Sequence, residues 1–163
     1  MMRWARSKSL HRISTHFRSF AGKRPAACWM VTESRMSVPV YAGGIYYVVD
    51  DKLRLIPDEE RQLHDTRRPV LVVTGSTANG DIRWPFVLAC PISGSTSRKT
   101  RYDVQLAAGQ GGVTKKCWIR VPAVQPLMKD VLGDRLGTLE ERLLSQVQAR
   151  LAQYLGMIDD NTG

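Results

Sequence analysis

Residues 67–93 have the sequence RRPVLVVTGSTANGDIRWPFVLACPIS, and this stretch decides the fold. Its first apolar run, residues 69–74, is rich in β-branched side chains and predicts a buried strand that opens with proline. Asn79-Gly80 follows, and both residues tolerate positive φ, so the pair favours a hairpin turn. The next apolar run, residues 84–92, is the expected partner strand. The stretch therefore predicts an antiparallel hairpin.

Further strands are expected on both sides of this hairpin. Residues 44–49 are β-branched and aromatic, and residues 102–106 alternate like a half-buried strand. A turn is expected at 109–112, a strand over 113–121 and a short last strand near 133–136. About five or six short strands at this spacing predict a mainly β fold, a small and strongly curved antiparallel sheet or barrel.

One helix is predicted at the C-terminal end of the domain. Apolar residues recur at steps of four from Leu139 to Leu155, which places them on one helical face. Thr138 and Glu141 form the Thr-x-x-Glu pattern of a capping box, and Gly156 is placed to end the helix. We therefore expect a β-rich α+β domain in which this helix plugs the curved sheet.

The length and the charge of the chain limit the classes of protein to which it can belong. The 163 residues suffice for one domain with a hydrophobic core, and no apolar run approaches the roughly 20 residues that span a bilayer. The net charge is +9, but residues 1–35 carry eight basic side chains against one acid, whereas the remainder has 16 basic and 14 acidic groups. The positive charge therefore belongs to the N-terminal segment and should not be credited to the domain.

The chain divides into a basic extension (1–40), a domain (41–158) and a short tail (159–163). Three hypotheses for the extension stay open: a targeting segment similar to a transit peptide, a basic arm for nucleic acid, or upstream sequence preceding a start at Met30 or Met36. A secretory signal is disfavoured, because no apolar stretch of about 7–15 residues follows the basic region.

Several kinds of chemistry are excluded or disfavoured by the residues present. The sequence lacks a phosphate-binding glycine-rich loop, a His-Glu-x-x-His motif and a Gly-x-Ser-x-Gly motif. His64 is the only histidine after Met36, so the domain cannot form a ribonuclease site with two histidines. The three cysteines form no Cys-x-x-Cys pair, which argues against zinc and favours reduced thiols in a cytoplasmic protein. We expect no cofactor and no metal.

Cationic and hydroxyl groups lie at the ends of the two central strands. Arg67 and Arg68 precede the first of these strands, and Ser93 ends the second. If the strands pair through the Asn79-Gly80 turn, Arg68 and Ser93 meet on one rim, because the two strands are nearly equal in length. An arginine beside hydroxyl groups suits a phosphate. The alternative is that the arginines are solvated and residues 93–97 merely turn the chain, which is the commoner outcome for charged runs.

Read in order, six segments of the chain resemble the MazF/PemK family of toxin endoribonucleases. These segments are GIYYVV (44–49), RRPVLVV (67–73), VLACPIS (87–93), YDVQL (102–106), GVTKKCWIR (112–120) and LGTL (136–139). The resemblance covers about residues 43–156. It implies an SH3-like barrel, a homodimer, metal-independent cleavage of single-stranded RNA, and a cognate antitoxin that holds the toxin in check.

The resemblance also implies roles for individual residues. The family's catalytic arginine precedes the proline that opens a strand, a position held here by Arg68. Its catalytic hydroxyl is usually threonine, and Ser93 stands there and keeps the hydroxyl. The implied reaction is attack by the substrate's own 2′-OH, which leaves a 2′,3′-cyclic phosphate and a 5′-OH. The first loop is longer than in short family members, so His64 and Asp65 remain only candidates for the rim of the site.

RNA binding needs a groove with positive charge and stacking surfaces. Trp84 and Trp118 are candidates for stacking, although Trp118 is equally suited to a core or a dimer interface. The candidate RNA-binding residues are charged or lie in the loop after Ser93; they are Arg67, Thr96, Arg98, Lys99, Lys115 and Lys116. Two alternatives stay open, a non-catalytic SH3-like module that binds protein or nucleic acid and an inactive toxin relic. The sequence does not identify a general base.

Overall fold

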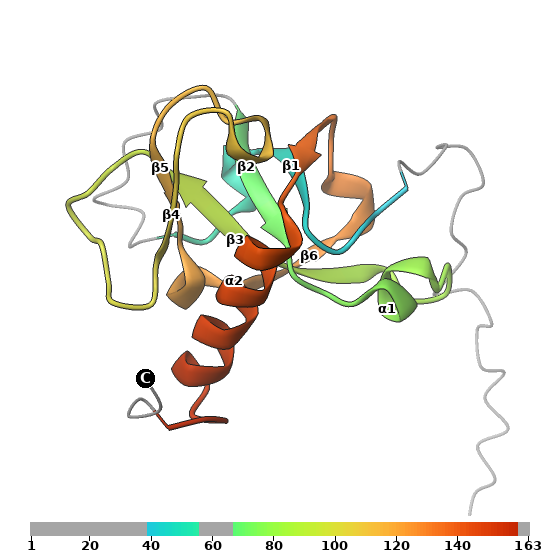
Figure 1. Cartoon of the computed structure of the whole chain (residues 1–163). Coiled ribbons are helices and arrows are strands. Elements are labelled where there is room, and N and C mark those ends of the chain that lie inside the picture. The colour runs from blue at the N-terminus through green and yellow to red at the C-terminus, as the bar shows by residue number, and fades with distance from the viewer. Residues whose placement is uncertain (1–38, 56–66, 160–163) are drawn as a thin grey trace, which may run out of the picture. The chain divides into compact units, whose positions relative to one another are not determined.

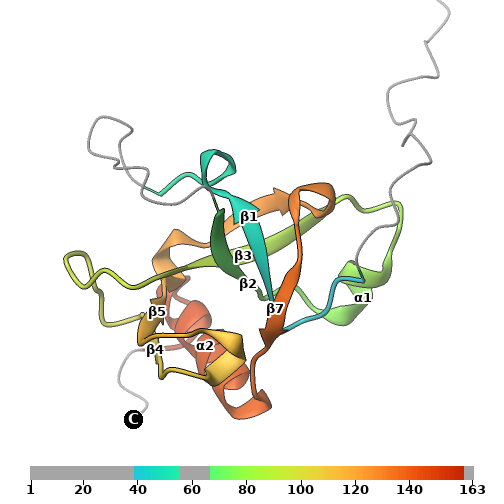
Figure 2. The ribbon, with the colours of Figure 1, turned by 90° about the horizontal axis from the view of Figure 1, so that it is seen from above.

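A computed structural model describes residues 39–55 and 67–159. An antiparallel sheet curls into a half-barrel, and one long helix packs against it (Figure 1 and Figure 2). The strands are β1 (Gly44–Val49), β2 (Arg67–Val72), β3 (Phe86–Ser93), β4 (Val104–Leu106), β5 (Cys117–Ile119), β6 (Gln125–Met128) and β7 (Arg135–Thr138). Their order is β4-β5-β3-β2-β1-β7, and β6 also pairs with β3. The mainly β fold with a C-terminal helix is thus confirmed.

Helical segments connect or cover these strands. The long helix is α2 (Glu141–Tyr154), and α1 is a single short turn of helix between β2 and β3. The shorter elements are α1 (Ser76–Gly80), η1 (Asp50–Lys52), η3 (Gln110–Gly112), η4 (Val121–Ala123) and η5 (Lys129–Val131). Among the described residues, no helix combines the length and apolar character needed to cross a membrane. Residues 1–38 of the predicted extension, His64 and Asp65 lie outside the described residues.

Both faces of the sheet are buried, because neighbouring residues of a strand point to opposite sides. Ile45 and Leu71 belong to a core cluster that also contains Val147 of α2. Tyr46 and Val70, their neighbours in sequence, belong to a second cluster on the other side. This explains why the central strands are apolar almost without interruption, whereas a strand buried on one face alternates.

The connection between β2 and β3 differs from the predicted two-residue turn. Asn79 and Gly80 end α1, and the Asn79 side chain donates to the Thr74 carbonyl over 2.8 Å. Lys129 closes the connection, because its Nζ donates to the carbonyls of Ala78 at 3.1 Å and of Asn79 and Asp81 at 2.8 Å. The strands pair as expected, but the hairpin-turn prediction is wrong.

The predicted capping box is also wrong, for a physical reason. Thr138 is the last residue of β7 and pairs with Gly44 of β1, so its backbone belongs to the sheet. The helix begins at Glu141, after an N-cap at Glu140 that makes no side-chain capping bond. Its end is as expected: Gly156 has φ 70°, and the amide of Gly156 donates to the carbonyl of Gln153 over 3.0 Å.

Candidate active site

The register of β2 and β3 places Arg68 level with Ser93. Val70 pairs with Pro91, Leu71 with Cys90, and continuing this antiparallel register by two residues brings Arg68 opposite Ser93. Both residues line the same pocket, whose volume is about 290 Å³. The two groups singled out from the sequence therefore share one site at the ends of adjacent strands, although the turn that joins these strands differs from the one expected.

The lining of this pocket is suited to an anion. Arg68 and Arg98 line it with guanidinium groups, and a third arginine, Arg120, is ion-paired with the lining carboxylate of Asp103. Four lining residues carry hydroxyl groups and four are apolar; they are Ser93, Ser95, Ser97 and Thr100, and Leu55, Pro91, Pro122 and Ala123. Guanidinium groups and hydroxyls are the donors that bind phosphate oxygens in proteins.

Arg68 is oriented by a buried carboxylate. Its Nε donates to Asp50 Oδ1 over 2.7 Å, and the side chains are 22% and 3% exposed. Because Nε is the atom that contacts Asp50, the terminal fork of the guanidinium is what Arg68 can offer to an oxyanion. The sequence analysis did not single out Asp50. The available signal was its place directly after β1, whose residue Val48 pairs with Arg68.

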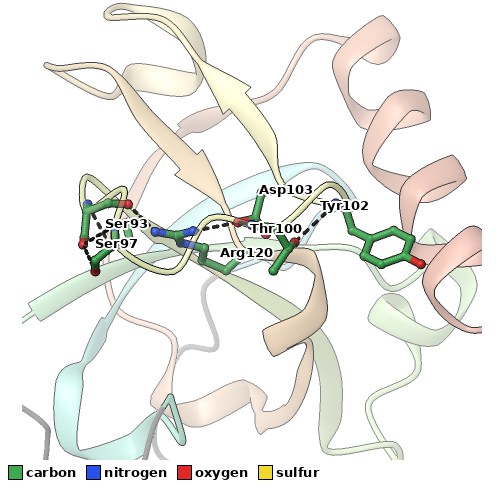
Figure 3. Close-up of polar contacts among 7 residues, drawn as sticks. Ser93, Ser97, Thr100, Tyr102, Asp103 and Arg120 are labelled. Carbon is green, nitrogen blue, oxygen red and sulfur yellow. Dashed lines mark hydrogen bonds and ion pairs between the residues drawn. The ribbon is translucent and has the colours of Figure 1, made fainter.

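Ser93 lies at the start of a loop rich in hydroxyl groups. Its Oγ accepts a hydrogen bond from the Ser95 amide at 3.2 Å, and the hydroxyls of Ser95 and Ser97 lie 2.9 Å apart (Figure 3). The loop projects from the end of β3 (Figure 1). The Ser93 side chain is thus held where the loop leaves β3, and it lines the same pocket as Arg68.

A second ion pair in the pocket wall was not predicted. Arg120 Nη1 donates to Asp103 Oδ2 over 2.6 Å, and these side chains are 12% and 1% exposed. Val104 pairs with Ile119, so continuing the β4–β5 register by one residue places Asp103 opposite Arg120. A signal was present in the sequence for Arg120, because its charge interrupts the apolar run of residues 117–121, whereas Asp103 falls on a polar position of an alternating strand.

The predicted RNA-binding residues divide into two groups. Arg98 lines the pocket, and Thr96 is exposed in the loop. The Lys115 side chain passes beside Gly94, because a methyl group added to Gly94 would lie 3.5 Å from the Cε of Lys115. The ammonium groups of Lys99 and Lys116 lie 5.9 and 5.5 Å from the centre of the Trp118 ring. Trp118 pairs with Ser93, so these lysines gather next to the pocket.

Arg67 stands apart from this group. It is exposed, lies 5.2 Å from the Tyr47 ring centre, and has its Nη1 3.7 Å from an Asp134 carboxylate oxygen. It does not line the pocket that Arg68 lines. Consecutive residues of a strand point to opposite faces, which separates the two arginines.

Neither tryptophan is placed as an open stacking platform at the pocket. Trp118 is only 6% exposed, which favours the core interpretation that the sequence left open. Trp84 is 53% exposed but packs edge-on against Phe86, at the opposite end of β3 from Ser93. Stacking by Trp84 at the Arg68–Ser93 pocket is therefore incompatible with its position.

The buried cysteines are poor nucleophiles. Burial, aided by the negative charge of Asp103, raises the pKa of the Cys90 thiol to about 12. Burial also raises the pKa of Cys117, although Lys115 opposes that shift. Both thiols are therefore protonated near neutral pH. Within residues 39–55 and 67–159, no three His, Cys, Asp or Glu side chains gather as a metal site.

Solved structures share this fold. The chain is similar to "MazE-MazF (Form-II) from Deinococcus radiodurans" (21% identity, 74% of this chain and 99% of that chain, TM-score 0.55). It is also similar to "Mycobacterium tuberculosis toxin MazF-mt6" (17% identity, 69% and 96%, TM-score 0.53). A third is "Endoribonuclease in complex with its cognate antitoxin from Mycobacterial species" (20% identity, 72% and 94%, TM-score 0.51).

A family model gives a more specific assignment than these structural likenesses. No curated protein matches the chain significantly. The model that matches describes a PemK-like, MazF-like toxin of type II toxin–antitoxin systems, and it covers residues 43–155, well over half of the sequence. Those residues include the strands of the curled sheet, both Arg68 and Ser93 of the pocket, and helix α2. The chain therefore belongs to the PemK-like, MazF-like family of type II toxins.

Proposed function

We propose that this toxin is a metal-independent endoribonuclease that cleaves single-stranded RNA at selected sequences through the Arg68–Ser93 pocket. The observation that carries the proposal is that Arg68 and Ser93 line one pocket at the ends of paired strands. Membership of the toxin family and the endoribonuclease among the similar structures support it.

The proposed reaction is an internal transesterification. The substrate's 2′-oxygen attacks the adjacent phosphorus, the bond from phosphorus to the 5′-oxygen breaks, and the products are a 2′,3′-cyclic phosphate and a 5′-OH. The 2′-OH loses its proton and the leaving 5′-oxygen gains one. Arg68 stabilises the negative charge on the phosphoryl group, because its guanidinium stays protonated at any physiological pH. Ser93 donates a hydrogen bond to a non-bridging oxygen.

The proposed partners follow from the same family. One neighbour is described as bound to its cognate antitoxin, and we propose that a cognate antitoxin covers the Arg68–Ser93 pocket of this chain. We propose that the active form is a homodimer. The proposed substrate is messenger RNA, which places the activity in the cytoplasm.

The decisive experiment compares two adjacent arginines. Arg68→Ala removes the guanidinium that lines the pocket, whereas Arg67→Ala removes an exposed one that lies against Tyr47. Purified proteins are incubated with single-stranded RNA in EDTA, and fragment ends are identified by mass spectrometry. We expect Arg68→Ala to lower the cleavage rate by about 10²–10³-fold, the effect of removing one stabiliser of a developing charge, and Arg67→Ala to have little effect.

Other outcomes separate the alternatives. Undiminished cleavage by a folded Arg68→Ala protein would refute the assignment. Binding of RNA without cleavage by the unaltered protein would favour a non-catalytic module. Induction in bacterial cells separates an intact toxin, which arrests growth, from an inactive relic, which does not.

A further inference from the structure

The loop that joins β3 to β4 is tied at both ends to one buried ion pair. Arg120 Nη2 donates to the Ser95 carbonyl at the start of the loop, and Arg120 Nη1 donates to Asp103 Oδ2 at its end (Figure 3). The same carboxylate oxygen accepts the amide of Thr100 at 3.0 Å. The backbone amide of Arg120 also donates to the Pro91 carbonyl of β3 at 2.8 Å.

Burial strengthens the attraction between these two charges relative to that in a surface ion pair. The side chain of Asp103 is 1% exposed and that of Arg120 is 12% exposed, so water competes little for either charge. The chain also contains an exposed counterpart, the pair of Arg67 and Asp134, whose side chains are 60% and 88% exposed and 3.7 Å apart. Such exposed pairs contribute little to structure.

Other hydrogen bonds within the loop lie at the surface. They include Lys99 N–H to the Thr96 carbonyl at 3.2 Å and Tyr102 N–H to Thr100 Oγ1 at 3.3 Å. The described core clusters include Tyr102 at the end of the loop but no residue between Gly94 and Arg101. The buried Arg120–Asp103 pair thus anchors both ends of this segment, and the Lys99 ammonium group over the Trp118 ring is a further contact along it.

The loop forms one wall of the pocket. Ser95, Ser97 and Arg98 line it, and the Ser95 amide donates to the hydroxyl of Ser93. We infer that Arg120 and Asp103 are positioning residues, a clamp that fixes residues 94–102 in the conformation that binds single-stranded RNA. The inference rests on the proposed endoribonuclease function. Neither side chain contacts the reacting atoms in this assignment.

The test removes both charges together. Removing one partner of a buried pair leaves an uncompensated charge and destabilises the fold, whereas replacing both with apolar residues is often neutral. The test variant is therefore Arg120→Met with Asp103→Leu. Its matched control is Arg67→Met with Asp134→Leu, which makes the same chemical change at the exposed pair.

Three measurements are made on the full chain: the urea midpoint of unfolding, hydrogen exchange at the Lys99 and Thr100 amides, and steady-state cleavage of single-stranded RNA. We expect the test variant to keep its midpoint, to exchange both amides at least about tenfold faster, and to raise KM about tenfold with kcat changed less than about threefold. The control should keep the midpoint and both exchange rates of the unaltered protein.

Two results would refute the positioning role of Arg120 and Asp103. A folded test variant with unchanged exchange and unchanged KM refutes it, and so does a variant whose kcat falls more than its KM rises, because Arg120 would then act on the reacting atoms. If the double variant fails to fold, Arg120→Lys serves instead: it keeps a charge beside Asp103 but lacks the fork that reaches Ser95, and the same changes are expected. If the unaltered protein does not cleave RNA, the proposed function fails, and hydrogen exchange still tests the clamp.

Discussion

Arg68 and Asp50 form a 2.7 Å hydrogen-bonded ion pair that joins the start of β2 to the residue directly after β1. Val48, two residues before Asp50, pairs with Arg68 in the sheet. The carboxylate is therefore placed by the same strand pairing that builds the core. Since the Asp50 side chain is 3% exposed, its charge acts on Arg68 with little screening by water.

Replacing Asp50 should damage both stability and activity. Asp50→Ala leaves the partly exposed Arg68 guanidinium without its partner, and we expect a loss of about 1–3 kcal/mol in the free energy of unfolding. Asp50→Asn keeps an oxygen acceptor and should fold better, yet cleave RNA at least about tenfold more slowly, because the guanidinium is less firmly oriented. Urea denaturation and cleavage assays measure the two effects. Asp51→Ala is the matched control, since that neighbouring side chain is 62% exposed; an equal loss there would contradict this account.

Lys115 and Lys116 should supply charge for RNA binding. Both are exposed, one beside Gly94 and the other over the Trp118 ring. Replacing both with glutamine should weaken RNA binding and flatten the plot of log affinity against log salt by up to about 0.7 for each phosphate that is no longer neutralised. Fluorescence anisotropy across a salt series measures the slope. The slope should be unchanged for Lys52→Gln, which alters an exposed lysine in η1. If the double variant and Lys52→Gln have the same slope, that result counts against a role for Lys115 and Lys116.

Lys129 should stabilise the connection between β2 and β3. Its ammonium group donates to the carbonyls of Ala78, Asn79 and Asp81, which leaves these acceptors unsatisfied when the lysine is removed. We expect Lys129→Met to lower the free energy of unfolding by about 2–4 kcal/mol, the effect of losing several charge-assisted hydrogen bonds. Urea denaturation provides the measurement, with Lys52→Met as the control. A loss below about 0.5 kcal/mol would show that water replaces the ammonium group.

The Cys90 thiol should resist alkylation while the protein is folded. Burial raises its pKa to about 12. At about pH 8 roughly one thiol in 10,000 is then ionised, against about one in ten to one in four for an unperturbed cysteine. The thiolate fraction, and with it the rate of alkylation, should increase as the pH rises toward 12. Peptide mapping after iodoacetamide treatment, with and without urea, measures each cysteine separately. Fast modification of Cys90 in the folded state contradicts the burial.

The sequence predicts those parts of the fold that depend on the nearest neighbours along the chain. The strand expected at 44–49 is confirmed as β1, and Gly156 ends α2 as expected. Predictions failed where a partner distant in sequence decides the structure. Thr138 has a capping pattern but pairs with Gly44, and Lys129 stabilises α1 where a hairpin turn was expected. The strand β6 was missed because Pro126 interrupts its pattern.

The residues of the candidate site also divide into those that the sequence could place and those that it could not. Arg68 and Ser93 could be paired from strand lengths alone, because an antiparallel register is set by simple counting. Asp50, Asp103 and Arg120 could not be placed by that argument, since each depends on which further strand lies beside the central pair. Their roles at the site, like those of Arg68 and Ser93, remain proposals for the experiments above.

The pairing that sets Arg68 level with Ser93 runs through residues 70–72 and 89–91, and these residues lie in the interior of the molecule. The spacing of Arg68 and Ser93 is therefore set by the part of the chain that is best protected from local unfolding. Only global unfolding separates the two residues. Heat or denaturant should then separate Arg68 from Ser93 only at the midpoint of global unfolding, which near-ultraviolet circular dichroism measures.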